Sequence, residues 1–276
     1  MNKEVNASTK PFLRWAGGKN WLVKNINNYL PIDGFNNYIE PFLGGGSIFF
    51  HLAPQKAILS DLNKELIETY KALRSNVNEI IDELSKFRND EKFYYQIRSK
   101  KIKSDIKKAA KFIYLNQTSF NGIYRVNLKG EYNVPFGHRK KDFLQPENLL
   151  KASKSLQFAD IKTRDFYDSL NDIQKNDLVF LDPPYTVTHN NNGFIKYNSK
   201  LFDLDAQRKL SAFIDCLAEI GAYYILTNAA HMEVKNIFSK PNNYMIEISR
   251  ASLVGGMKAK RGKYSELIFT NIDRHG

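Results

Sequence analysis

The chain of 276 residues has one cysteine, Cys216, and no apolar run near the roughly 18 residues that a membrane-spanning helix requires. A single cysteine excludes a disulfide framework and a cysteine-based metal site. The N-terminal stretch MNKEVNASTK is polar and lacks the apolar segment of a signal peptide. We therefore expect a cytoplasmic protein with no membrane partner and no metal, in which Cys216 is a small buried hydrophobe of a helix.

Acidic residues are too few to balance the basic ones, and the formal net charge is +12. Most of the excess lies in residues 64–141, where eighteen Lys and Arg face nine Asp and Glu. Residues 92–111 alone hold eight basic residues and one acid, and five aromatic residues lie within or just after this run: Phe93, Tyr94, Tyr95, Phe112 and Tyr114. A basic run alone is often only a solvated face, but its confinement and its aromatic neighbours favour a nucleic-acid phosphate backbone as partner.

Short apolar runs alternate with helical patterns along most of the chain. The runs predicted to be strands are 38–40, 56–60, 157–162, 178–181 and 223–226, with helices expected at 47–53 and 203–220. Such alternation predicts an α/β fold with a doubly wound, Rossmann-like, mainly parallel sheet. Two late runs, 244–250 and 265–271, have no helix between them and should form an antiparallel hairpin at the edge of the sheet.

Residues 64–148 interrupt this rhythm. They predict several helices from Glu65 to about Phe120, followed by a β-hairpin at 125–137 that turns at Lys129-Gly130. Because this segment is also the basic one, we interpret it as an inserted, mostly helical target-recognition domain. The catalytic domain would then consist of residues 1–63 and 149–276.

A glycine-rich stretch, EPFLGGGS at 40–47, follows the first predicted strand, and Asp61 ends the second. Ligands of open α/β sheets bind at this carboxyl edge, where glycines allow a close backbone approach and an acid can bind the two hydroxyls of a ribose. The stretch is not a Walker loop. A plain tight turn, and a helix N-cap at Asp61, are the alternatives. Together the motifs favour a nucleoside-bearing ligand held without a pyrophosphate clamp.

The strand at 178–181 ends in Asp182-Pro183-Pro184-Tyr185. The prolines have no N–H but keep their carbonyl acceptors in a stiff turn, and Asp182 adds a carboxylate oxygen. Two adjacent acceptors match the two hydrogens of one exocyclic amino group, and Tyr185 offers a face for a planar base. A purely structural Asp-Pro turn is the alternative.

Five stretches in this order give the chain a resemblance to the Dam-like, D12 class of DNA adenine-N6 methyltransferases: FLRWAGGKNWLV, YIEPFLGGGSIFF, ILSDLNKELI, FNGIYRVNLKGEYNVPFG and LVFLDPPY. They span residues 12–185. The resemblance implies a site-specific enzyme that transfers a methyl group from S-adenosylmethionine to N6 of a flipped adenine in double-stranded DNA. Asp182, Pro183 and Tyr185 would be its catalytic residues.

The same resemblance implies a set of cofactor contacts: Trp15, Lys19, Phe42, Gly44, Asp61, Asp165, Phe166 and Asp182. Asp61 would bind the ribose hydroxyls, while Asp165 and Phe166 would hold the adenine. Without the resemblance, Trp15 would be interpreted as a core residue and Lys19 as a solvated charge.

The resemblance also assigns DNA recognition to the predicted hairpin, with Tyr124, Arg125 and Asn127 as contacts. Arg125 corresponds to an arginine that contacts a guanine in relatives, and Arg paired with guanine O6 and N7 is the commonest specific contact in the major groove. A structural role is the alternative for Arg125.

Two stretches depart from the family pattern. The stretch TVTHNNNGF, after the Asp-Pro-Pro-Tyr motif, resembles the corresponding loop of members that act on asymmetric sites of type IIS restriction systems. Residues 250–263 carry five basic residues and no acid, and we interpret them as a second loop that contacts the DNA backbone. The recognition sequence, GATC or an asymmetric site, stays open. We expect a monomer or weak dimer, with a separately acting restriction endonuclease as a partner in a restriction-modification system. Cytosine-N4 methylation, protein glutamine methylation and non-catalytic DNA binding are the competing hypotheses.

Overall fold

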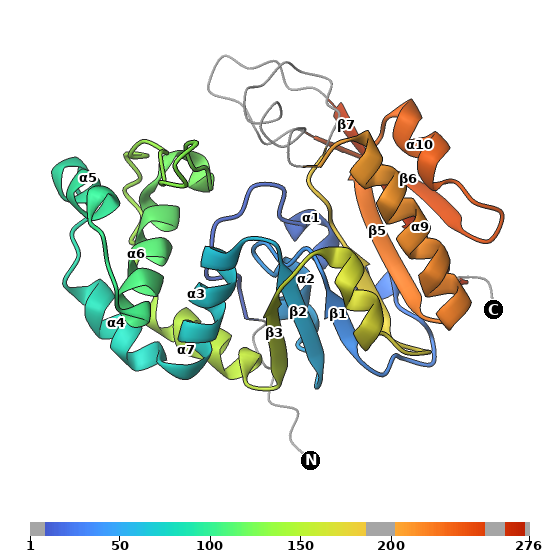
Figure 1. Cartoon of the computed structure of the whole chain (residues 1–276), viewed down its shortest axis with the longest axis horizontal. Helices are drawn as coiled ribbons and strands as arrows, with labels where there is room; N and C mark the ends of the chain where they lie inside the picture. The colour runs from blue at the N-terminus through green and yellow to red at the C-terminus, as the bar shows by residue number, and fades with distance from the viewer. Residues whose placement is uncertain (1–8, 186–201, 252–262, 274–276) are drawn as a thin grey trace. The chain divides into compact units, whose positions relative to one another are not determined.

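A computed structural model of the chain describes residues 9–185, 202–251 and 263–273 (Figure 1). In this part of the chain, one hydrogen-bonded sheet has the strand order β3-β2-β1-β4-β5-β7-β6. Its strands are β1 (Tyr38–Glu40), β2 (Ala57–Asp61), β3 (Ala159–Thr163), β4 (Leu178–Leu181), β5 (Tyr223–Ala229), β6 (Tyr244–Ala251) and β7 (Lys263–Thr270). The α-helices are α1 (Asn20–Val23), α2 (Ser47–Leu52), α3 (Lys64–Ser75), α4 (Val77–Ser85), α5 (Glu91–Ser99), α6 (Asp105–Thr118), α7 (Pro146–Leu156), α9 (Leu204–Ile220) and α10 (Met232–Phe238). Short 3-10 helices are η1 (Ile26–Tyr29), η2 (Phe120–Gly122) and η3 (Phe166–Asp172).

The chain divides by its internal contacts into two compact units. Unit 1 consists of residues 1–26 and 43–163, and unit 2 of residues 27–42 and 164–276. The domain limits expected from the sequence, with an insertion at 64–148, stay a prediction.

Unit 1 contains the parallel pair β2–β3 and the helices α2 to α7, of which α3 and α6 contact each other closely. Polar caps set where its helices begin, because Asn63, Asp90 and Ser104 accept a backbone N–H in the first turn of α3, α5 and α6. The helices expected from Glu65 to Phe120 are therefore confirmed.

The end of α6 is buried although it is polar. Asn116 accepts the backbone N–H of Arg14 at 2.7 Å and donates to the Arg14 carbonyl at 2.6 Å, while Gln117 donates to the carbonyl of Phe12 at 2.7 Å. These bonds satisfy the buried amides and fix the N-terminal segment against the helix.

The hairpin expected at 125–137 is wrong as a pair of regular strands. The structure has isolated bridges, Val126 to Tyr132 and Ser119 to Phe136, with the turn at Lys129-Gly130 confirmed. The carboxamide oxygen of Asn127 accepts the backbone N–H groups of both Lys129 and Glu131, so a side chain here replaces part of the ladder. We call residues 119–137 the recognition segment.

Unit 2 contains β1, β4 and β5 in parallel and the antiparallel pair β7–β6, which confirms the hairpin at the sheet edge. Strands β1 and β4 have the predicted bounds, and their residues are all buried. The buried carboxylate of Asp177 accepts from the backbone and side chain of Asn37 at the start of β1. The central strands are thus fixed at their amino ends.

Helix α9 begins at the cap Asp203 and ends at Gly221, whose φ of 78° only glycine adopts without strain. Its apolar face includes Leu210, Phe213 and Leu217. Cys216 lies at the flank of this face and is partly exposed, so the expectation of a buried cysteine is wrong. In the described residues, no helix is both long and apolar enough to cross a membrane.

Candidate functional site

The glycine-rich turn between β1 and α2 is shaped by two glycines with positive φ, 47° at Gly44 and 63° at Gly46. The indole of Trp15 lies directly on it, because a Cβ at Gly44 would be 2.7 Å from that ring and one at Gly45 would be 2.9 Å from the Trp15 Cβ. A larger residue at either position would displace Trp15. The positive φ values and the packed indole both account for these glycines, and the alternative of a plain tight turn stays open.

Asp61 joins this turn to the end of β2. Its Oδ2 accepts the Gly44 N–H at 3.0 Å, and its Oδ1 accepts the Asn63 N–H at 2.9 Å. Burial raises the pKa of the Asp61 carboxyl, and the backbone N–H groups of Asn63, Gly44 and Leu62 oppose that rise. The cap of α3 is Asn63, so the alternative that Asp61 caps this helix is wrong.

Lys19 is buried, with 3% of its surface exposed, and its ammonium donates to the carbonyl of Gly17 at 2.7 Å. The alternative of a solvated charge is therefore wrong. Trp15 is partly buried, so it is not a plain core residue either. In unit 1 the structure thus brings together Trp15, Gly44 and Asp61.

Unit 2 holds an aromatic cluster beside an acid. Phe42 stacks on Phe166 with ring centroids 5.2 Å apart, and Phe202 lies edge-on to Phe42 at 5.6 Å. Asp165 caps η3 by accepting the Tyr167 N–H, and it also accepts from Lys209 Nζ at 3.0 Å. The ammonium of Lys209 lies 5.3 Å from the centre of the Phe166 ring. Sequence reasoning missed Lys209, because nothing in the chain pattern brings α9 beside η3.

Asp182 follows β4 directly, and the β4–β5 register places Leu181 opposite Leu226. Thr227, the next residue of β5, donates from Oγ1 to Asp182 Oδ1 at 2.9 Å. This bond fixes how the carboxylate is turned. The sequence could have indicated Thr227 as a residue of the site, because it follows directly on the strand predicted at 223–226.

Tyr185 donates its hydroxyl to Glu266 Oε2 at 2.8 Å, and Glu266 on β7 is 3% exposed. Tyr38 likewise donates to the buried Glu40 at 2.9 Å. Burial first, then the carboxylate of Glu40 and more weakly that of Asp182, hold the pKa of the Tyr38 phenol well above its usual value. This phenol therefore stays a neutral donor, and unit 2 concentrates negative charge near the end of β4.

Arg125 is exposed, and its Nε donates to Asn133 Oδ1 at 2.7 Å. Tyr124 stacks on Trp15, and its hydroxyl donates to Glu65. Asn127 donates to Glu131 in addition to closing the turn. The predicted DNA contacts thus lie together in the recognition segment, with Arg125 the most exposed of the three.

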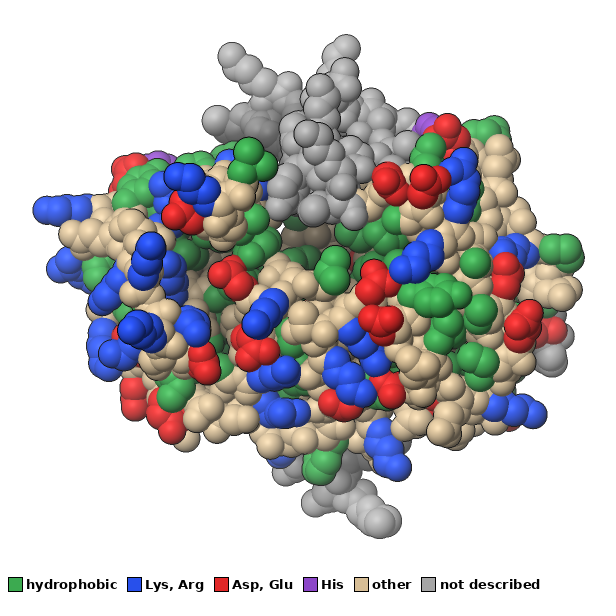
Figure 2. Space-filling model, viewed as in Figure 1, with side chains coloured by type: hydrophobic (Ala, Val, Ile, Leu, Met, Phe, Trp, Pro, Cys, Tyr) green, Lys and Arg blue, Asp and Glu red, His purple; other side chains and the backbone are tan. Residues whose placement is uncertain are grey.

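A groove of about 300 Å³ lies in unit 1 where α4, α5 and α6 meet. Its lining combines apolar side chains and lysines with one acid and one serine: Phe87, Ile97, Ile102, Lys100, Lys101, Lys103, Lys107, Glu83 and Ser104. Figure 2 shows Lys and Arg side chains gathered over this helical part of unit 1. The basic run of the sequence is therefore an exposed surface.

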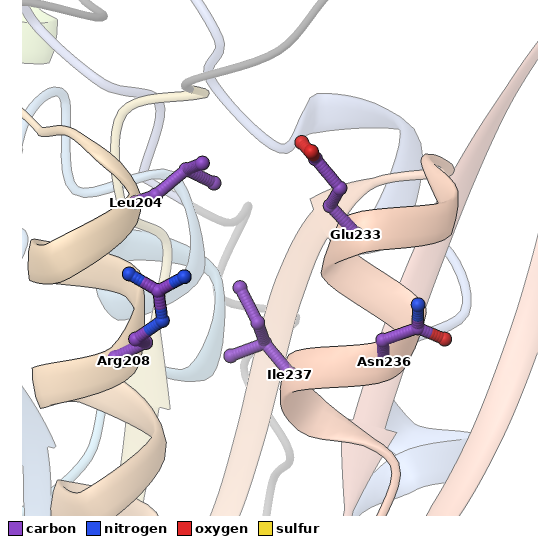
Figure 3. Close-up of a pocket in the computed structure, with 5 residues that line it drawn as sticks. All are labelled: Leu204, Arg208, Glu233, Asn236 and Ile237. Atoms are coloured by element: carbon purple, nitrogen blue, oxygen red, sulfur yellow. The ribbon is translucent and has the colours of Figure 1, made fainter.

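A second pocket, of about 170 Å³, lies between α9 and α10 in unit 2. Figure 3 shows Leu204 and Arg208 of α9 across from Ile237 of α10, with Glu233 and Asn236 completing the lining. None of the predicted site residues lines it, and Arg208 is paired with Asp205. Among the described residues, no group of His, Cys, Asp and Glu side chains could hold a metal ion.

Known proteins are similar to this chain along most of its length. The model of the D12 class N6 adenine-specific DNA methyltransferase family matches residues 15–252. A type II methyltransferase of Lactococcus lactis subsp. cremoris is 33% identical over 273 residues, 95% of each chain. One of Methanocaldococcus jannaschii is 35% identical, covering 94% of this chain and 98% of the relative. The DNA adenine methylase of Escherichia coli is 30% identical, covering 91% and 92% respectively.

These matches decide between the hypotheses that the sequence left open. They favour adenine over cytosine-N4, DNA over protein glutamine, and an enzyme over a non-catalytic DNA-binding protein. The chain belongs to the D12 class N6 adenine-specific DNA methyltransferase family and is an adenine-specific DNA methyltransferase.

Proposed function

We propose that this enzyme is site-specific and transfers a methyl group from S-adenosylmethionine to N6 of an adenine flipped out of double-stranded DNA. The observation that carries the proposal is the end of β4, where Thr227 fixes the carboxylate of Asp182 directly before Pro183. A carboxylate oxygen and a carbonyl of a residue without N–H are two acceptors for the two hydrogens of one amino group.

The residues of unit 1 suit the sugar and methionine parts of the cofactor. Asp61 is a partly buried carboxylate whose acceptor sites match the hydroxyls of a ribose, and the glycine turn brings backbone within reach of a ligand. Trp15, Lys19 and Gly44 are proposed as further contacts.

The residues of unit 2 suit an adenine ring and a cation. Phe166 offers an aromatic face and Asp165 an acceptor for the amino group of the cofactor adenine, while Phe42, which stacks on Phe166, is proposed to lie by the methionine part. The carboxylates of Glu40, Asp182 and Glu266 create a field that favours the positive sulfonium. When bound, S-adenosylmethionine supplies an electrophilic methyl group.

In the proposed chemistry, Asp182 and the Pro183 carbonyl accept the two N6 hydrogens of the target adenine. This contact turns the amino nitrogen towards sp³ character and makes its lone pair available to take the methyl group. The carbon–sulfur bond of the sulfonium would break as the carbon–nitrogen bond forms, the thioether would leave, and one N6 proton would pass to solvent. Tyr185 stacks on the flipped base, and its bond to Glu266 holds the ring in one orientation. Proximity and electrostatics carry the catalysis, and neither a covalent intermediate nor a metal is required.

Flipping the adenine costs a few kcal/mol, which contacts with the duplex must offset. We propose that Arg125 reads a guanine and that the lysines of the α4–α6 groove bind phosphates. The stretch TVTHNNNGF and most of the basic stretch 250–263 lie outside the described residues; we propose that the basic stretch contacts the DNA backbone. The enzyme would serve a restriction-modification system with a separate endonuclease, as a monomer or weak dimer.

The test is to express the chain in a host that lacks DNA methylases and to sequence its DNA with detection of modified bases. We expect N6-methyladenine at one short sequence that contains a guanine, and none with Asp182→Ala. Methylcytosine, or adenine methylation without a fixed sequence, would contradict the proposal. Methylation at an asymmetric site in place of GATC would agree with the resemblance of the stretch TVTHNNNGF to members that act on asymmetric sites of type IIS restriction systems.

A further inference from the structure

Within unit 1, Tyr124 of the recognition segment lies against the tryptophan that covers the glycine turn. The Trp15 and Tyr124 rings are stacked, with centroids 5.8 Å apart and planes 21° from parallel. Trp15 also leaves no room for a Cβ at Gly44 or Gly45. Trp15 therefore contacts Tyr124 and the glycine turn at once, so a displacement of Tyr124 changes how Trp15 packs beside the turn.

A second connection runs through the Tyr124 hydroxyl, which donates to Glu65 Oε2 at 2.7 Å. Glu65 lies in the first turn of α3, four residues after Asp61. Asp61 in turn accepts the Gly44 N–H. Tyr124 is therefore linked to the glycine turn through its ring and Trp15, and its hydroxyl binds the first turn of α3, the helix that follows Asp61.

Tyr124 is also held firmly within the recognition segment. Its ring packs against Phe112 of α6 at 5.5 Å and against Tyr132 at 5.8 Å, and the Tyr132 hydroxyl donates to the Ile123 carbonyl. The next residue along the chain is Arg125. A shift of Tyr124 would therefore be transmitted to the base of the Arg125 side chain.

We propose that Tyr124 is a positioning residue that couples cofactor binding at the glycine turn to DNA binding by the recognition segment. The inference rests on the proposed function, since it takes S-adenosylmethionine and duplex DNA as the two ligands. Binding of either one orders Trp15 and Tyr124 together, so the second ligand finds its side of the stack already placed. By thermodynamic reciprocity, each ligand then raises the affinity of the other by the same factor.

The sequence provides its own probe, because its two tryptophans are Trp15 and Trp21. In a Trp21→Phe background, the emission of Trp15 can be followed while S-adenosylhomocysteine, the cofactor without its transferable methyl group, is titrated with and without duplex DNA. We expect DNA to lower the Kd of the cofactor at least about fivefold. DNA alone should also change the Trp15 emission, although no methyl transfer can occur.

In this background, Tyr124→Ala should reduce the ratio of the two Kd values to about one, and Tyr124→Phe should lower it only in part by removing the bond to Glu65. Tyr244→Ala, at an exposed tyrosine of β6, is the control and should keep the full ratio. Should Tyr124→Ala fail to fold, Tyr124→Phe and Glu65→Ala give the same test, because each removes the bond between the two side chains, and both must lower the ratio.

The coupling role would be overturned if Tyr124→Ala, or both Tyr124→Phe and the Glu65 variant, left the ratio of the two cofactor Kd values unchanged. So would a chain that binds both ligands without mutual effect, and in that case the proposed function would still stand. A chain that binds neither ligand would instead contradict the proposed function. The two failures are therefore distinguishable.

Discussion

The strand ends and the recognition segment are ordered in different ways. At the strand ends, backbone N–H groups and buried side chains hold the proposed site residues, as at Asp61 and Asp182. In the recognition segment, partly exposed side chains such as Asn127 and Asn133 provide many of the bonds. The former arrangement suits chemistry, which requires fixed geometry, while the latter suits readout, because exposed hydrogen bonds can be exchanged for bonds to bases.

Asp182→Ala should produce the largest effect, since it removes the carboxylate that Thr227 orients at the end of β4. We expect the methyl-transfer step to slow at least about 100-fold, about 3 kcal/mol, because a preorganised acceptor is lost. Single-turnover transfer with saturating DNA measures this step. The exposed Asp168 of η3 provides a control, and Asp168→Ala should stay near the wild-type rate. A rate within tenfold of wild type for Asp182→Ala would remove Asp182 from the catalytic role.

Gly44→Ala and Gly130→Ala compare the two regions directly, because both glycines have positive φ. Each substitution should lose about 1–2 kcal/mol of stability from backbone strain. Only Gly44→Ala also meets the Trp15 ring, whereas Gly130 has open space around its missing Cβ. Thermal unfolding and calorimetric titration of the cofactor should show the greater loss, and weakened cofactor binding, for Gly44→Ala alone. Equal losses would show that the contact with Trp15 is unimportant.

Arg125→Ala tests whether the exposed region reads sequence. It should lose about 1–3 kcal/mol of discrimination at one base pair, because no other side chain matches guanine O6 and N7 so well. Methylation rates across a panel of singly substituted duplexes measure this loss, with Lys129→Ala as a control in the same segment. If Arg125→Ala slows the reaction equally on every duplex, the guanidinium contacts a phosphate.

The smallest effect per residue is expected from the lysines of the α4–α6 groove. Replacing Lys100, Lys101 and Lys103 with Ala should lower the slope of log affinity against log salt by up to about 1 per phosphate contact, on specific and random DNA alike. Lys151→Ala on α7 is a control with an exposed lysine. An unchanged slope would make the groove a solvated surface only.

The strand ends could be predicted because an apolar run and the polar residue that ends it are neighbours in the sequence. Strands β1 and β4 have the expected bounds, and Asp61 and Asp182 lie at or next to the ends of β2 and β4. Their partners could not be predicted in the same way, because contacts such as Tyr185 to Glu266 depend on strand order and register. Lys19 shows the same limit, since a buried ammonium depends on an acceptor that only the folded turn provides.

The recognition segment was predicted less well for a different reason. Its turn follows from Lys129-Gly130, but the expected strands compete with side-chain bonds, and Asn127 satisfies backbone donors that a ladder would use. The sequence pattern favours a β-hairpin there, whereas the folded segment uses side-chain hydrogen bonds such as those of Asn127. Such disagreement is expected of residues that bind a partner.

The bonds between the N-terminal segment and α6 have a consequence for synthesis on the ribosome. Arg14 leaves the exit tunnel long before Asn116, which lies 102 residues further along the chain, and Asn37 precedes Asp177 by 140 residues. The segment around Arg14 therefore cannot take its final place until α6 has been synthesised. Closing such long loops adds only a logarithmic entropy cost, so the final stability suffers little, while residues such as Arg14 stay open to chaperones and proteases until their partners emerge.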